Sequence, residues 1–148
     1  MDYEASLNQA LDLLADGEDK KAETLLLGGV RHVKANLTGS ESDLERYYYW
    51  GRFLTAMEEY EQALLKFEQA LGYDPAHEGS LWETASILLH DMDRPELAKA
   101  LLAEKLIPLC PGNILYTEAL HEAEFLMRVR SSPPEPPKDD GAPDDDQP

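Results

Sequence analysis

The chain has 148 residues, of which 43% are apolar, enough to bury the core of one globular domain. Its 30 acidic and 13 basic residues give a net charge of −17, which repels nucleic acid and anionic lipid and favours a basic or neutral partner protein. We expect a cytoplasmic protein, because no apolar run could span a membrane, the acidic start at Met1 lacks a secretory signal, and Cys110 is a single cysteine.

The first predicted unit, residues 3–36, is a pair of helices that turns at Gly17. Apolar residues of its first helix recur at the helical spacing of three and four: Leu7, Leu11 and Leu14. Small and apolar residues of its second helix follow at matching intervals: Ala22, Leu26 and Gly29. Residues 36–41 are rich in Ser, Thr and Gly, which predicts a loop to the next unit.

The second unit, residues 44–77, shows the clearest pattern of the chain. We expect its first helix to run to about Met57 and its second from about Tyr60 to about Tyr73, because Pro75 prevents continuation. Small residues and one phenylalanine recur where the two helices must approach each other: Gly51, Ala63, Phe67 and Ala70. These residues have packing roles rather than chemical ones.

The third unit, residues 79–112, repeats this pattern more weakly. Pro95 opens its second helix, in the first turn where proline is tolerated. Pro108 predicts that this helix stops near Leu106. Two pairs have the spacing of a capping box, in which a hydroxyl accepts from a free backbone N–H: Ser42 with Glu45, and Ser80 with Glu83.

A last helix is predicted over residues 113–130, with Asn113 as its cap. Its inner face is expected to carry Leu115, Ala119, Glu122, Leu126 and Val129. Residues 131–148 contain six prolines, six acidic residues and no large aliphatic residue. Because such a segment cannot bury enough apolar area to offset its ordering entropy, we expect a disordered acidic tail.

The run from Leu44 to Pro75 resembles a tetratricopeptide repeat, a helix–turn–helix unit of about 34 residues. The residues that carry this resemblance are Gly51, Ala63, Phe67, Ala70 and Pro75. Extended over residues 1–130, the resemblance implies an all-α, right-handed superhelix of about three hairpins and a capping helix. It also implies a non-enzymatic adaptor or chaperone-like module that holds a partner polypeptide in a concave groove.

The same resemblance implies that Tyr47 and Trp50 pack inside the array while Tyr48 faces the groove with Arg52 and Thr55. Carrying this face to the other units adds further groove residues: Leu7, Leu11, Leu14, Glu83, Ile87 and His90. The groove is then apolar at its N-terminal end and mixed at its C-terminal end, which suits an apolar peptide with a basic group.

We expect no catalytic residue, cofactor or metal ion. Part of a calcium-binding loop is matched by Asp12, Asp16, Gly17 and Glu23. However, Leu14 stands where the loop needs a carboxylate ligand, and Lys20 brings a positive charge near the ion. Two alternatives stay open at this point. The first unit of the array could mediate self-association into a homo-oligomeric scaffold. The acidic three-repeat chain also resembles the repeat-containing chaperones of type III secretion translocators.

Overall fold

The computed structural model describes residues 1–131, and within this range every regular element is helical and no strand is present. The helices are α1 (Tyr3–Ala15), α2 (Asp19–Ala35), α3 (Leu44–Ala56), α4 (Tyr60–Tyr73), α5 (Glu78–Ser86), α6 (Pro95–Leu101), α7 (Ile107–Leu109) and α8 (Ile114–Ser131). Three tighter or wider turns complete them: η1 (Glu41–Asp43), η2 (Ile87–Asp91) and η3 (Leu102–Leu106). The all-α prediction is confirmed. Ser131 closes α8 rather than opening a tail, and the remaining residues predicted to be disordered, 132–148, lie outside the described range.

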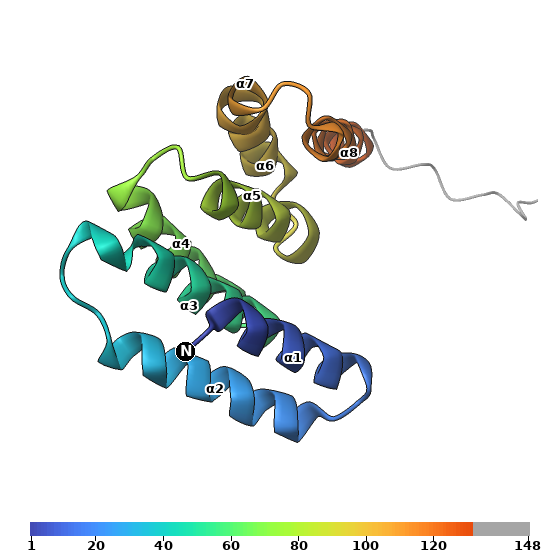
Figure 1. Ribbon diagram of the computed structural model, residues 1–148. Helices are drawn as coiled ribbons and strands as arrows, with labels where there is room; N and C mark the ends of the chain where they lie inside the picture. The colour runs from blue at the N-terminus through green and yellow to red at the C-terminus, as the bar shows by residue number, and fades with distance from the viewer. Residues whose placement is uncertain (132–148) are drawn as a thin grey trace, which may run out of the picture.

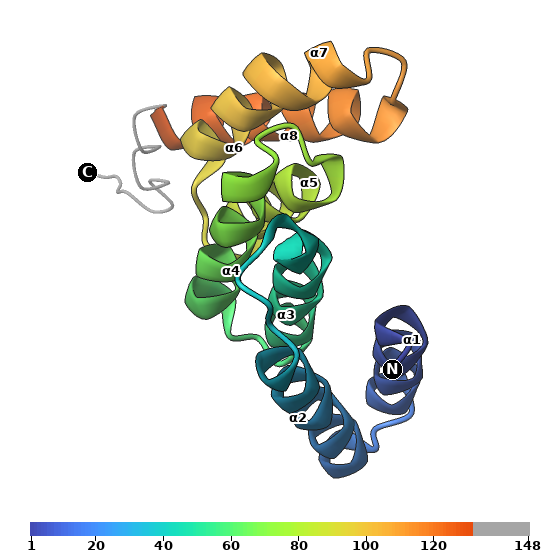
Figure 2. The ribbon, with the colours of Figure 1, turned by 60° about the vertical axis from the view of Figure 1, so that its left-hand side comes forward.

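Successive helices pack on one another, and α1, α3 and α5 also contact each other as alternate members of the series. Figure 1 shows the helical hairpins following one another from the blue N-terminal pair to the orange α8. Figure 2 shows α1, α3 and α5 on one side of the molecule, with α4 and α6 on the other. The alternation places every second helix on the same face, so residues far apart in sequence meet there. Within residues 1–131, no helix has both the length and the apolar composition needed to cross a bilayer.

The first hairpin turns at Gly17, whose φ of 79° is a conformation that glycine adopts without strain. Its core reaches into the second hairpin and consists of Leu7, Ala10, Leu26, Val30, Val33 and Phe53. The ring of Phe53 lies against Gly29, and a Cβ placed on that glycine would come within 2.6 Å of the ring. The absence of a side chain at this position therefore lets α2 approach α3.

The second hairpin agrees with its predicted limits, because α3 ends at Ala56 and α4 runs from Tyr60 to Tyr73. Gly51 lets the two helices approach closely, since a Cβ on this glycine would lie 2.6 Å from Cε1 of Phe67. The Phe67 side chain is fully buried, together with Ala63 and Ile87. The packing roles predicted for Gly51, Ala63 and Phe67 are thus confirmed.

Neither predicted capping box forms as expected. Ser42 lies inside η1, and the hydroxyl of Ser40, which precedes η1, accepts from the Ser42 N–H at 3.4 Å. In the third unit, α5 begins at Glu78, so Ser80 lies within its first turn instead of before it. His77 caps this helix, with Nδ1 accepting from the Ser80 N–H at 3.2 Å. The spacing of serine and glutamate could not reveal that the helices begin at different residues.

The loop before α3 is organised around Asp43, a carboxylate that is only 1% exposed. The backbone N–H of Thr38 donates to it at 2.8 Å, the N–H of Gly39 at 2.7 Å, and Arg46 pairs with it at 3.2 Å. Burial by itself raises the pKa of the Asp43 carboxyl, but these donors outweigh burial and hold the pKa below its ordinary value. The carboxylate therefore closes the loop in its charged form.

We expect Asp43→Asn to lower stability at neutral pH and to flatten its dependence on acid. Because the pKa of Asp43 is lower in the folded chain, its stabilising contribution is complete above the unfolded-state pKa of about 3.9 and is lost as the pH falls through the folded value. Urea unfolding followed by circular dichroism between about pH 6 and about pH 3 measures this effect. The exposed Asp12→Asn serves as a control that should keep the wild-type pH profile. If the stability of Asp43→Asn fell with acid as steeply as that of the wild type, the stabilising role of the Asp43 carboxylate would be contradicted.

In the third unit the helices continue further than predicted. Pro95 is the first residue of α6, as expected. The prediction that this path stops near Leu106 is wrong, because it passes through η3 and α7 to Leu109. Proline lacks an N–H and crowds the carbonyl of the preceding turn. The wider π-helical turn η3 ends at Leu106, two residues before Pro108, and its width leaves room for the proline ring, so one more helical turn can follow.

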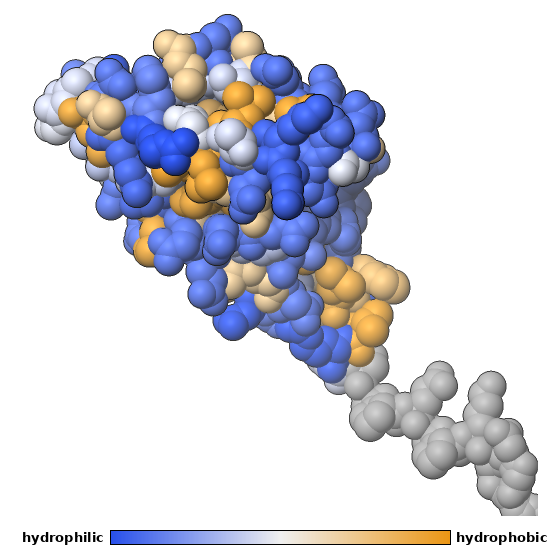
Figure 3. All heavy atoms as spheres, turned by 90° about the horizontal axis from the view of Figure 1, so that it is seen from below, coloured by the Kyte–Doolittle hydropathy of each residue, from blue (hydrophilic) through white to orange (hydrophobic). Residues whose placement is uncertain are grey.

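The last helix, α8, is capped as predicted, with Asn113 Oδ1 accepting from the Leu115 N–H at 2.9 Å. Its predicted inner face is wrong in part, because Leu115 is 59% and Val129 57% exposed, and Glu122 is exposed as well. Ala119 and Leu126 do pack on the third unit, as predicted, and Tyr116 and Ala123 join them there. Burial of this side of the helix in the core sets the rotation of α8. Exposed ion pairs with α6 and the turn before it accompany this packing: Arg130 with Asp93 and Glu96, and Lys99 with Glu124. Figure 3 shows apolar side chains exposed at the surface next to the point where α8 ends.

Candidate functional site

The face formed by α1, α3 and α5 carries a network of charges drawn from all three helices. Arg52 of α3 stands at its centre and pairs with Glu4 of α1 at 2.9 Å. On its other side the guanidinium lies 3.9 Å from Glu83 of α5. The Tyr49 hydroxyl donates to the same oxygen of Glu4 at 2.7 Å. We call Glu4, Tyr49, Arg52 and Glu83 the arginine network.

Aromatic rings hold the arginine in place. The Arg52 guanidinium carbon lies 5.6 Å from the ring centre of Tyr48 and 5.7 Å from that of Tyr49. The two rings themselves meet edge to face at 5.1 Å. Only 21% of the Arg52 side chain is exposed, so its charge is partly removed from water and its orientation is set by these neighbours.

The network leaves a residual negative charge, because two carboxylates share one guanidinium. The Tyr49 hydroxyl and Arg52 lower the pKa of Glu4, whereas burial and the adjacent Glu4 raise the pKa of Tyr49 to about 12. Burial raises the pKa of Glu83, and the charge of Glu4 adds to this, against the opposing effect of Arg52. Glu83 is therefore a partly desolvated carboxylate that its distant arginine compensates incompletely.

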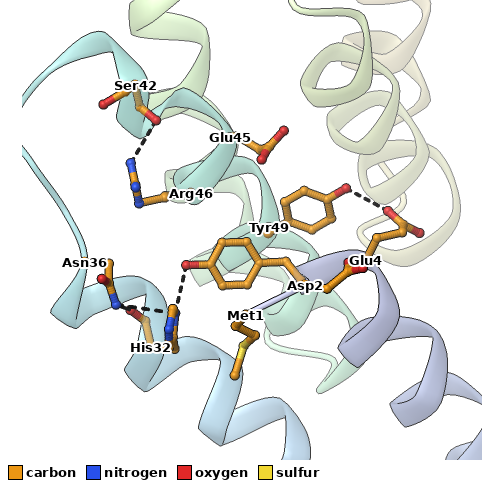
Figure 4. Close-up of a pocket in the computed structure, with 10 residues that line it drawn as sticks. Met1, Asp2, Glu4, His32, Asn36, Ser42, Glu45, Arg46 and Tyr49 are labelled. Atoms are coloured by element: carbon orange, nitrogen blue, oxygen red, sulfur yellow. Dashed lines mark hydrogen bonds between the residues drawn. The ribbon is translucent and has the colours of Figure 1, made fainter.

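A hollow of about 430 Å³ adjoins the network where α1 begins and α2 ends. Residues from the start of α1, the end of α2 and the start of α3 line it: Met1, Asp2, Tyr3, Glu4, His32, Asn36, Ser42, Glu45, Arg46 and Tyr49. The Tyr3 hydroxyl and His32 Nδ1 form a hydrogen bond of 3.0 Å. Figure 4 shows the Tyr49 hydroxyl pointing to Glu4 on the other side of the hollow. The lining offers hydroxyl, amide and carboxylate groups to the hollow, so this end of the face is polar rather than apolar.

Two residues predicted for the groove lie in the core instead. Leu7 is 2% exposed and packs in the cluster of α1, α2 and α3. As the first helix of the array, α1 has to cover α2 and α3 with this position. Ile87 is 1% exposed and contacts Phe67 and Ala63. It stands directly after α5, at the start of η2, where α4 packs against this turn and covers the position.

The remaining predicted residues are divided among three places. Tyr48 is half-buried between α3 and α5, with its ring against Gly79 and 5.1 Å from that of His77. The Tyr48 ring therefore covers the neighbouring hairpin, and the guanidinium of Arg52 lies over the face of the ring. The Thr55 hydroxyl donates to the carbonyl of Gly51 at 2.9 Å. Of the predicted set, Arg52, Glu83 and Tyr48 come together.

The outer predicted residues do not join the network. Leu14 lines a separate hollow of about 290 Å³ beside Met57 and Lys20, and Leu11 is 42% exposed. At the other end His90 approaches Glu122 of α8 at 3.2 Å, with both side chains nearly half exposed. The predicted groove residues thus mark the two ends of one molecular face and not a single continuous pocket.

The prediction that Tyr47 and Trp50 pack inside the array is wrong in part, because both side chains are only half-buried on α3. The indole contacts the first core cluster, while the ring of Tyr47 stacks on it at 5.9 Å. In α3 the fully buried positions are Gly51 and Phe53 instead. Tyr49 lies toward a neighbouring helix, since its hydroxyl donates to Glu4 of α1.

Sequence reasoning missed Glu4 as a member of the site. An acidic residue in the first turn of a helix is common for electrostatic reasons and gives no signal of a distant partner. Only the contact between α1 and α3 brings Glu4 to Arg52, across 48 positions in sequence.

Comparisons of the chain with protein-family models, with curated proteins and with solved structures found no match.

Proposed function

We propose that this protein is a non-enzymatic interaction module of the tetratricopeptide-repeat type, an adaptor or chaperone-like protein that binds a partner polypeptide across α1, α3 and α5. The arrangement of the helices supports this proposal, because alternate helices share one face while the intervening helices pack behind it. The arginine network is the single observation that carries it. Three successive hairpins each contribute a charged side chain to one partly desolvated cluster.

The charge of the network selects the class of partner. Glu4 and Glu83 carry two negative charges against the single positive charge of Arg52, and burial already penalises the charged form of Glu83. A lysine or arginine side chain of a bound segment would supply the missing positive charge. The aromatic faces of Tyr48 and Tyr49 offer apolar contact beside it. The proposed ligand is therefore an apolar peptide segment with at least one basic residue.

A phage-displayed peptide library selected on the immobilised chain tests this proposal. We expect enriched peptides to contain a basic residue next to apolar ones, and purified examples to bind Glu83→Gln at least about tenfold more weakly, which is about 1.4 kcal/mol. Replacing glutamate by glutamine keeps the shape of the side chain and removes only its charge.

Glu68→Gln is the matched control, since Glu68 is an exposed glutamate on α4, behind the proposed face. Its affinity for the same peptides should equal that of the wild type. Selection of peptides without basic residues, or equal losses in both variants, would refute the proposed site.

A further inference from the structure

A second surface lies on the side of α3 away from the arginine network, and the proposed function does not involve it. Three aromatic rings form a ladder there: Tyr73 stacks on Tyr47 at 6.3 Å, and Tyr47 on Trp50 at 5.9 Å. Lys66 of α4 places its ammonium group 4.0 Å from the Trp50 ring centre, and Lys34 of α2 places its own at 5.5 Å. We call these five residues the aromatic–lysine surface.

The two lysines share one indole and repel each other. Burial and the charge of Lys34 lower the pKa of Lys66. Neither ammonium group belongs to an ion pair of the described residues, although the chain is rich in carboxylates. Two cations held at one ring repel each other, and an anion bound beside them would offset this repulsion.

We propose that residues 132–148 of the same chain dock on the aromatic–lysine surface. This segment follows α8 and combines two chemistries that match the surface. Its first half is proline-rich, with Pro133, Pro134, Pro136 and Pro137, and its second half carries Asp139, Asp140, Asp144, Asp145 and Asp146. Proline-rich chains pack on aromatic grooves in the polyproline II conformation, which suits the stacked rings of Tyr47 and Tyr73. The aspartates then supply the carboxylates that Lys34 and Lys66 lack.

The segment is long enough to reach this surface. It starts after Ser131, and the end of α8 is held on the third unit by the pairs of Arg130 with Asp93 and Glu96. From α8 the packing runs through α6 and α5 to α4, three steps of about 8–10 Å each between helix axes. At about 3.1 Å per residue in an extended polyproline conformation, residues 132–148 span about 50 Å. Attachment to the same chain also gives the segment a high effective concentration at the surface.

Zero-length carbodiimide coupling of the full-length chain, followed by peptide mass spectrometry, tests the proposal. The reagent joins a lysine to a carboxylate only where the two touch. We expect links from Lys34 and Lys66 to Asp139–Asp146 to exceed those from Lys20 and Lys21, which are exposed on the same helix as Lys34, by about tenfold. Sodium chloride at about 0.5 M should abolish the excess by screening.

Mixing isotopically labelled and unlabelled chains before coupling distinguishes the source of the segment. Links within one chain support the proposal. Links between labelled and unlabelled chains would overturn it and assign the surface to the segment of a second copy. Equal coupling of all four lysines, or coupling that salt does not change, would also overturn it. The binding of peptides to the arginine network does not depend on either coupling result, so the two proposals are tested independently.

Discussion

Truncation of Phe67 to alanine is expected to lower the free energy of unfolding by about 3–5 kcal/mol. The ring is fully buried at the point where α3, α4 and η2 meet, with Gly51 on one side and Ile87 on the other. Its removal leaves a cavity that Gly51 cannot fill, because a glycine has no side chain to move into the space. Urea unfolding followed by circular dichroism gives the difference in stability directly.

Leu65→Ala provides the matched control for this measurement. Leu65 lies on the same helix and is 51% exposed, so its truncation should change the free energy of unfolding by only about 0.5 kcal/mol. Similar losses for the two variants would mean that the burial of Phe67 is not the source of stability. The comparison therefore separates core packing from the helix propensity of α4.

Adjacent glycines of α2 are expected to respond to alanine in opposite directions. Gly29→Ala should destabilise the protein by about 1–3 kcal/mol, because the added methyl group would enter the ring of Phe53, whose atom Cζ is 2.6 Å from the ideal Cβ position. Gly28→Ala should stabilise it by about 0.5–1 kcal/mol, because no atom lies within 4 Å of the new Cβ and alanine favours the helix.

The same unfolding experiment checks both variants, and each is the control for the other. A double variant, Gly29→Ala with Phe53→Leu, should lose less stability than the sum of its two single changes, because the smaller side chain makes room for the methyl group. Additivity in the double variant would show that α2 and α3 are not in close contact at Gly29. Destabilisation by Gly28→Ala would show that the added methyl group does not stand in open space.

These contacts matter for the proposed site as well as for stability. Gly29 sets the approach of the first hairpin to the second, and Gly51 sets the approach of α3 to α4. The arginine network joins α1, α3 and α5, so its distances depend on how closely the hairpins stack. A core variant that spreads the hairpins should therefore weaken peptide binding without touching Glu4, Arg52 or Glu83.

The sequence by itself determined the helical class and the limits of the second hairpin. Apolar residues at three- and four-residue spacing, Pro75 after the helix and small residues at Gly51 and Ala63 are local signals, and each has a direct physical cause. The cap at Asn113 and the start of α6 at Pro95 were predictable for the same reason, since both depend on backbone groups a few residues away.

Only the tertiary structure decided which side of each helix faces outward. Leu7 and Ile87 belong to the pattern of the groove but lie in the core, because α1 covers α2 and α3 while α4 packs against the start of η2. Leu115 belongs to the predicted inner face of α8, yet it faces outward because Tyr116, Ala119 and Ala123 are the residues that pack in the core. A helical period fixes relative directions along one helix, whereas the absolute rotation depends on the packing of all its neighbours. Glu4 reaches Arg52 for this reason alone, and no spacing along the chain encodes a contact between separate hairpins.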